Sequence, residues 1–294
     1  QFILGLVVIK IQHRYFKKQF NHIMSNTSKG GNNFQSILAA LVIPIAIVIG
    51  YVVWQFVLGD PSGFEGNDPS KNPLPNHILA MMYKGGYIVP ILIGTFITVV
   101  TFSIERFITI SKSKGSGNVD SFIRNIRNLM ANGDLNGAKA ACAKQGGSVA
   151  NVVNAGIEAY RNMEADKNMD KERKLAGLQK EIEEATTLEL PMLSKNLVII
   201  STIASIATLL GLFGTVLGMI RAFAALATAG APDAVALSTG ISEALINTAL
   251  GIGTSAIAII MYNFYTSKID SITYGIDEAG YSIVQSFASR NKEN

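Results

Sequence analysis

Glu243 is the residue of this sequence whose position most suggests proton chemistry. It precedes an uncharged stretch, residues 244–267, that is long enough to cross the ~30 Å hydrocarbon core of a bilayer as a helix. An ionised carboxylate beside such a stretch is costly, so an acid found there is by default a candidate for binding and releasing protons. The alternative is a residue of the first helical turn, where the helix dipole favours a negative charge.

Two threonines are predicted to lie at the depth of this acid. The apolar runs 197–220 and 244–265 are joined by a short loop, so the two helices should be antiparallel. Matching their midpoints places Thr215 within about one turn of Glu243 and Thr248. Threonine hydroxyls form hydrogen bonds between membrane helices, although they are also common where helices simply pack. One acid and two hydroxyls at one depth indicate a proton path.

Glycines are expected to let these two helices approach closely. Small residues at a helix contact allow the backbones to come together and leave hydroxyls within reach of each other. The residues predicted to serve in helix packing are Gly211, Gly214, Gly218 and Gly251.

Residues 211–218 read GLFGTVLG, and residues 241–251 read ISEALINTALG. Together these two segments resemble the MotA/TolQ/ExbB family of proton channel subunits, and its ExbB members most closely. The combination at this spacing is specific, whereas either segment alone is weak. The resemblance covers roughly residues 85–268. The family often has proline where this chain has Thr208, so no helix kink is predicted there. The resemblance implies an ion path lined by Glu243, Thr215 and Thr248.

The same resemblance implies an assembly and not a lone channel. Proteins of the ExbB type are expected to be homopentamers around a small single-span partner of the ExbD type, which contributes an intramembrane aspartate. Such a motor in the inner membrane uses proton-motive force to drive a TonB-like protein and so energises outer-membrane transport. A TolQ-like role, a gliding or flagellar stator role and a passive membrane scaffold are the alternatives.

Composition places the chain among helical membrane proteins. Of its 294 residues, 49% are hydrophobic and only 16% are charged, which is unusual for a soluble chain. We therefore predict an all-α polytopic membrane protein with four transmembrane helices and a cytoplasmic helical domain. That is one span more than the three-span ExbB pattern, and the added one is the first. The predicted spans are residues 37–58, 87–110, 196–228 and 239–267.

Charge distribution predicts the topology. Thirteen of the 25 Lys and Arg residues lie in the helical domain, residues 111–195, and others lie in a basic arm, residues 1–36. Both termini and this domain should therefore face the cytoplasm. Residues 1–23 are either a surface-bound part of the arm or not native. The other segments are a periplasmic loop with an interfacial segment at 59–86, a periplasmic loop at 229–238 and a cytoplasmic C-terminal helix at 268–294.

The pair Glu105–Arg106 marks the cytoplasmic end of the second predicted span. Its simplest interpretation is an interfacial anchor with a local salt bridge, because long charged side chains reach from a helix end to the membrane surface. A second interpretation places Glu105 at the inner mouth of a pore.

Nothing in the sequence indicates an enzyme. The single cysteine, Cys142, and three separated histidines form no metal-ligand pattern, and no phosphate-binding loop of the Walker type is present. Mixed charges without a recognition motif argue against nucleic-acid binding. No cofactor is expected, and the proton is the transported ion.

Overall fold

The computed structural model describes residues 32–166, 169–228 and 234–290. These residues are almost entirely helical, and within them the only β pairing is a single bridge between Phe64 and Pro73. The main helices, in chain order, are α2 (Asn32–Val53), α3 (Ile78–Tyr83), α4 (Ile88–Ser113), α5 (Val119–Ala131), α6 (Leu135–Gln145), α7 (Gly147–Ala165), α8 (Lys171–Ser194), α9 (Leu197–Thr228) and α10 (Ala234–Arg290). Three short turns, η1 (Trp54–Leu58), η2 (Pro61–Gly63) and η3 (Glu65–Asn67), link α2 to the loop before α3.

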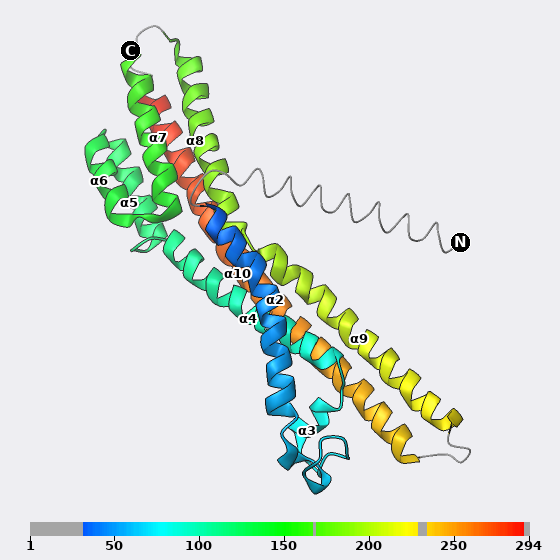
Figure 1. The fold of residues 1–294 in the computed structure, drawn as a ribbon. Helices are drawn as coiled ribbons and strands as arrows, with labels where there is room; N and C mark the ends of the chain where they lie inside the picture. Colours follow the sequence, from blue (N-terminus) through cyan, green and yellow to red (C-terminus); the bar gives the residue numbers. More distant parts are fainter. Residues whose placement is uncertain (1–31, 167–168, 229–233, 291–294) are drawn as a thin grey trace, which may run out of the picture.

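Four helices are long and apolar enough to cross a membrane, which confirms the predicted all-α polytopic fold. α4, α9 and α10 lie against one another along the long axis of the molecule, and α2 packs on α4 (Figure 1). The helices α5 to α8 gather at one end, and α3 lies toward the other end (Figure 1). The apolar stretches belong to α2, α4, α9 and α10.

α2 packs against α4 through glycines on both helices. A Cβ atom added to Gly50 would lie 2.4 Å from the carbonyl oxygen of Pro90, and one added to Gly94 would lie 2.8 Å from the Cα atom of Ile47. Backbones at these distances leave no room for side chains between them. The first span is therefore a closely fitted neighbour of α4.

α10 is one continuous helix of 57 residues. At 1.5 Å per residue it is about 85 Å long, far more than a bilayer requires. The predicted limit between residues 267 and 268 marks no break in the helix. Figure 1 shows the C-terminal part of α10, in red, passing between α7 and α8.

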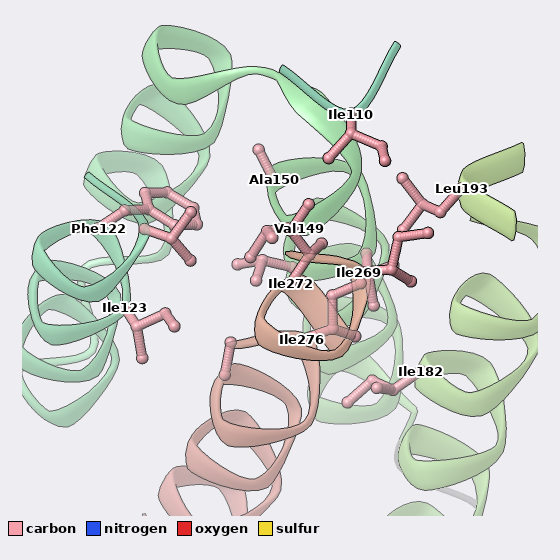
Figure 2. Close-up of a cluster of buried hydrophobic side chains, with 14 of the residues drawn as sticks. Ile110, Phe122, Ile123, Val149, Ala150, Ile182, Leu193, Ile269, Ile272 and Ile276 are labelled. Carbon is pink, nitrogen blue, oxygen red and sulfur yellow. The ribbon is translucent and has the colours of Figure 1, made fainter. Parts of the chain in front are cut away.

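The helical domain has an apolar core that α10 completes. α5 buries Val119, Phe122, Ile123, Ile126 and Met130, a spacing that forms one helical face. Figure 2 shows how side chains from α4, α5, α7, α8 and α10 converge. From α10 the contributors labelled there are Ile269, Ile272 and Ile276. This packing ties the membrane-spanning part of α10 to the domain.

Side-chain caps and one sharp turn set the limits of the domain helices. Asn118, Asp134 and Asp170 each accept a hydrogen bond from a backbone N–H of the first turn of α5, α6 and α8. The junction between α8 and α9 is at Asn196, which adopts a left-handed φ of 65°. Asparagine tolerates this conformation better than most residues, so the chain can change direction there.

Candidate functional site

The predicted packing glycines all lie where α9 meets α10. A Cβ atom on Gly211 would lie 2.9 Å from the carbonyl oxygen of Asn247, and one on Gly251 would lie 2.5 Å from that of Ala207. A Cβ atom on Gly218 would lie 3.0 Å from that of Ala244. The absence of side chains at these positions therefore brings the two backbones together. We call this contact the seam.

Thr215 and Thr248 meet across the seam. Their hydroxyl groups are hydrogen-bonded to each other, as the antiparallel register predicts. The Thr215 hydroxyl also lies 3.2 Å from the carbonyl oxygen of Gly211. Both hydroxyls lie 3.3 Å from the carbonyl oxygen of Ala244, which follows Glu243. The pair can pass hydrogen bonds along but does not store a charge.

Glu243 lies on α10 about one turn before Thr248. Its side chain is only 17% exposed, and its Oε2 atom lies 3.6 Å from the Nη1 atom of Arg221 on α9. The acid is therefore a mostly enclosed carboxylate that faces Arg221, at the end of the seam nearest α3.

Asn247 belongs to this site, although its role was not predicted from the sequence. The residue is 2% exposed and donates from Nδ2 to the carbonyl oxygen of Gly85, 2.9 Å away. It fills the space left by Gly214, where an added Cβ atom would lie 2.6 Å from the Asn247 Cβ atom. The only sequence signal for Asn247 was that it lies on the same face of the predicted helix as Glu243.

The carbonyl group of the Asn247 side chain is buried without a partner among the described residues. Leaving such an acceptor unpaired costs about 1–3 kcal/mol. The hydrogen bond to Gly85 fixes the orientation of the Asn247 side-chain amide. If the amide were reversed, its carbonyl oxygen would face the carbonyl oxygen of Gly85, and neither could donate a hydrogen bond. The seam thus presents one free acceptor close to Glu243.

Glu105 lies apart from this site and has different partners. It pairs with Arg106, whose Nε donates to it over 2.6 Å, and it accepts a hydrogen bond from Asn196 over 3.3 Å. Arg106 is 2% exposed and donates to the carbonyl oxygens of Met192 and Leu193. This network joins α4 to the junction of α8 and α9. The predicted local salt bridge is present, but the buried Arg106 side chain points into the protein and does not extend outward to a surface. The network gives no direct support to a role at a pore mouth.

The site offers acid–base chemistry without a metal centre. Among the described residues, no three His, Cys, Asp or Glu side chains are close enough to hold a metal ion. Farther along the seam, the hydroxyl of Ser255 donates to the carbonyl oxygen of Ala204, and Thr254 is buried. The arrangement can bind and release a proton at Glu243 and offer hydroxyls beyond it.

Comparison with known proteins adds a family match. Residues 148–278 match the model of a family described as the MotA/TolQ/ExbB proton channel family. This range contains both glycine-rich segments and every residue of the seam.

Individual relatives are similar over part of the chain. The Tol-Pal system protein TolQ of Pseudomonas aeruginosa is 28% identical over 42% of this chain and 54% of its own length. The biopolymer transport protein ExbB of Aquifex aeolicus is 34% identical over 39% of this chain and 69% of its own length. The biopolymer transport protein ExbB of Pseudomonas putida is 31% identical over 29% of this chain and 26% of its own length. The chain spans about half the length of several curated relatives it matches.

Proposed function

The chain belongs to the MotA/TolQ/ExbB proton channel family, and we propose that it is the ion-path subunit of an inner-membrane motor that converts proton-motive force into mechanical work. The observation that carries this proposal is the placement of Glu243 at one end of a seam in which Thr215 and Thr248 share a hydrogen bond. Glu243 would bind the proton, and the two hydroxyls would form the polar path beyond it.

The proposed topology places both termini and the helical domain in the cytoplasm. Support comes from the concentration of Lys and Arg in residues 111–195, because basic segments are retained on the cytoplasmic side. In this arrangement Glu243, Arg221 and the turn after α3 lie toward the periplasm. A proton would therefore reach Glu243 from the outside first.

The proposed assembly is a homopentamer around an ExbD-like single-span partner, working with a TonB-like protein. The family resemblance supports this assembly. A motor also needs a moving group whose charge changes during the cycle, and an aspartate on a partner helix would supply it. The most specific role we propose is to energise TonB-dependent outer-membrane transport.

A TolQ-like role is the second candidate. Relatives named TolQ match the chain, at 28% identity for the protein of Pseudomonas aeruginosa and 34% for that of Haemophilus influenzae. The seam serves both roles equally, since each requires the same proton transfer. The partner that co-purifies with the chain from its native membrane would decide between them.

Proton flux into liposomes tests the proposed function. The chain is reconstituted with its partner, and internal acidification is followed under an imposed voltage. Glu243→Gln should reduce the flux to that of empty liposomes, because glutamine fills the same space and binds no proton. Glu181→Gln, an exposed position on α8, is the matched control and should leave the flux unchanged. Equal flux in the two variants would support a passive scaffold instead.

A further inference from the structure

The segment between α2 and α4 folds into a compact cap, which we define as residues 54–86. Trp54 donates from Nε1 to the carbonyl oxygen of Tyr83 over 3.1 Å, and their rings stack with centroids 4.7 Å apart. Phe64, only 1% exposed, meets the Tyr83 ring edge-on at 5.6 Å. These contacts hold the two ends of the cap together.

The middle of the cap is tied to the same aromatic cluster. The backbone N–H of Leu74 donates to the carbonyl oxygen of Gly63 over 2.9 Å. The Lys84 ammonium donates to the carbonyl oxygen of Ser70 over 3.0 Å and lies above the Phe64 ring. The cap is therefore a folded unit and not a loose connection.

The cap is attached to the seam through its last residues. Asn247 on α10 donates to the carbonyl oxygen of Gly85, a contact between residues 162 positions apart. Gly86 has φ +74°, and a Cβ atom there would lie 3.0 Å from the Nη1 atom of Arg221 on α9. The end of the cap thus lies against Arg221, which pairs with Glu243, and against Asn247, which lies one helical turn after Glu243 on α10.

A hollow of about 440 Å³ lies between part of the cap and α10. Ser238, Thr239 and Ser242 form its wall on α10, whereas the cap contributes Lys84, Met81 and the largely apolar residues 72–76. The polar groups along the α10 side of a space of this size can hold water. Ser242 directly precedes Glu243 on α10, so the hollow reaches the helix position next to the acid.

We propose that this hollow is the aqueous entrance of the proton path, and that Asn247 is the latch that holds the end of the cap in place beside it. The proposal rests on the function proposed above and names where the proton enters. The cap would then determine how water reaches the acid. The unpaired carbonyl oxygen of Asn247 would accept a hydrogen bond from water in the latched state.

Thiol labelling tests the entrance. The chain has one cysteine, Cys142, which is buried, and burial raises the pKa of its thiol to about 11. In a Cys142→Ala background, Ser242→Cys places a thiol in the hollow, and Leu245→Cys places one on the 63%-exposed apolar face of α10. A charged, membrane-impermeant methanethiosulfonate is added from the cap side to cells expressing the chain with its partner.

The entrance requires Ser242→Cys to react at least about tenfold faster than Leu245→Cys, because the reagent attacks a hydrated thiolate. Equal rates, or reaction of Ser242→Cys only from the opposite side of the membrane, would overturn the proposal. The labelling needs no proton flux. A failed labelling result therefore counts against the entrance alone, whereas unchanged flux in Glu243→Gln counts against the proposed function.

A second labelling position tests the latch. Val89 is 0% exposed and packs beneath the cap with Trp54 and Leu58. Val89→Cys should be unreactive in the parent and should become reactive when combined with Asn247→Ala, which removes the donor to Gly85. Asn263→Ala, at an exposed position on the same helix, is the matched control and should leave it unreactive. If Asn247→Ala does not increase the reactivity, Asn247 is not a latch.

Discussion

Thr215 and Thr248 place two hydroxyl groups around one backbone carbonyl, that of Ala244. Each hydroxyl has a single proton to donate, so the pair and the carbonyl can exchange hydrogen bonds without moving the backbone. This arrangement suits a relay next to Glu243. A purely structural pair would need only the shape of the two side chains.

Removing one hydroxyl while keeping the shape separates these two roles. We predict that Thr248→Val lowers partner-dependent proton flux by about tenfold or more, equivalent to the ~1.4 kcal/mol of one lost hydrogen bond. Thr248→Ser should retain most of the flux, because it keeps the hydroxyl. Flux is measured in liposomes at equal protein content. Similar flux in the valine and serine variants would show that the hydroxyl is not used.

The residues of the seam were predictable from the sequence in type and in depth, but not in their partners. Thr215 and Thr248 follow from two apolar runs in antiparallel register. Asn247 could not be assigned, because its partner Gly85 lies 162 residues away outside any periodic pattern. The pairing of Arg221 with Glu243 could not be predicted either, since sequence spacing does not show which acid Arg221 faces.

At the scale of helices, the contact between α9 and α10 depends on glycines at defined positions. Gly251 lies against backbone atoms of α9, which cannot move aside as a flexible side chain would. Gly253, two residues along the same helix, has nothing within 4 Å of an added Cβ atom. The two glycines therefore form a matched pair for the same substitution.

We predict that Gly251→Ala destabilises the folded chain by about 1–3 kcal/mol, because an extra methyl group overpacks a close contact. Gly253→Ala should be neutral or stabilise slightly, since alanine favours the helix where space is free. Thermal unfolding in detergent, monitored by circular dichroism, measures both variants. Equal stability of the two would mean that the seam tolerates separation of its backbones.

The sequence pattern did not predict where one helix ends and the next begins. The sequence predicted a fourth span ending at residue 267 and a C-terminal helix from residue 268. Both belong to one helix, α10, in which Ile272, Ile276 and Ile283 bury one face in the domain core. A change in composition thus marked a change of surroundings and not a change of backbone. The continuous helix is a consequence of tertiary packing, which single-chain periodicity does not reveal.

At the scale of the whole molecule, α10 connects the seam to the helical domain without interruption. Asn247 and Glu243 lie near its first turns, and Phe287 lies near its last, packed edge-on against Tyr160 at 4.8 Å. A displacement at the seam would therefore be transmitted to the domain through a single rigid element. This geometry suits a part that moves against a partner.

We predict that this chain alone does not conduct protons effectively. Between residues 197 and 267 the sequence contains two acids, Asp233 in the predicted loop at 229–238 and Glu243 at the end of the seam. The groups beyond Glu243 are hydroxyls, glycines and Asn247, none of which holds a proton as a charge. A proton crossing 100 mV releases about 2.3 kcal/mol, and its capture needs a second group that changes charge as parts move.

The purified chain in liposomes should therefore show voltage-driven flux close to that of empty liposomes, and co-reconstitution with the proposed single-span partner should raise it. The gain should disappear when the partner's intramembrane aspartate is replaced by asparagine, which keeps the shape and removes the proton-binding group. It should also disappear in Glu243→Gln with the native partner. Strong flux from the chain without any partner, abolished by Glu243→Gln, would instead make it a self-sufficient channel, since the seam alone would then complete the path.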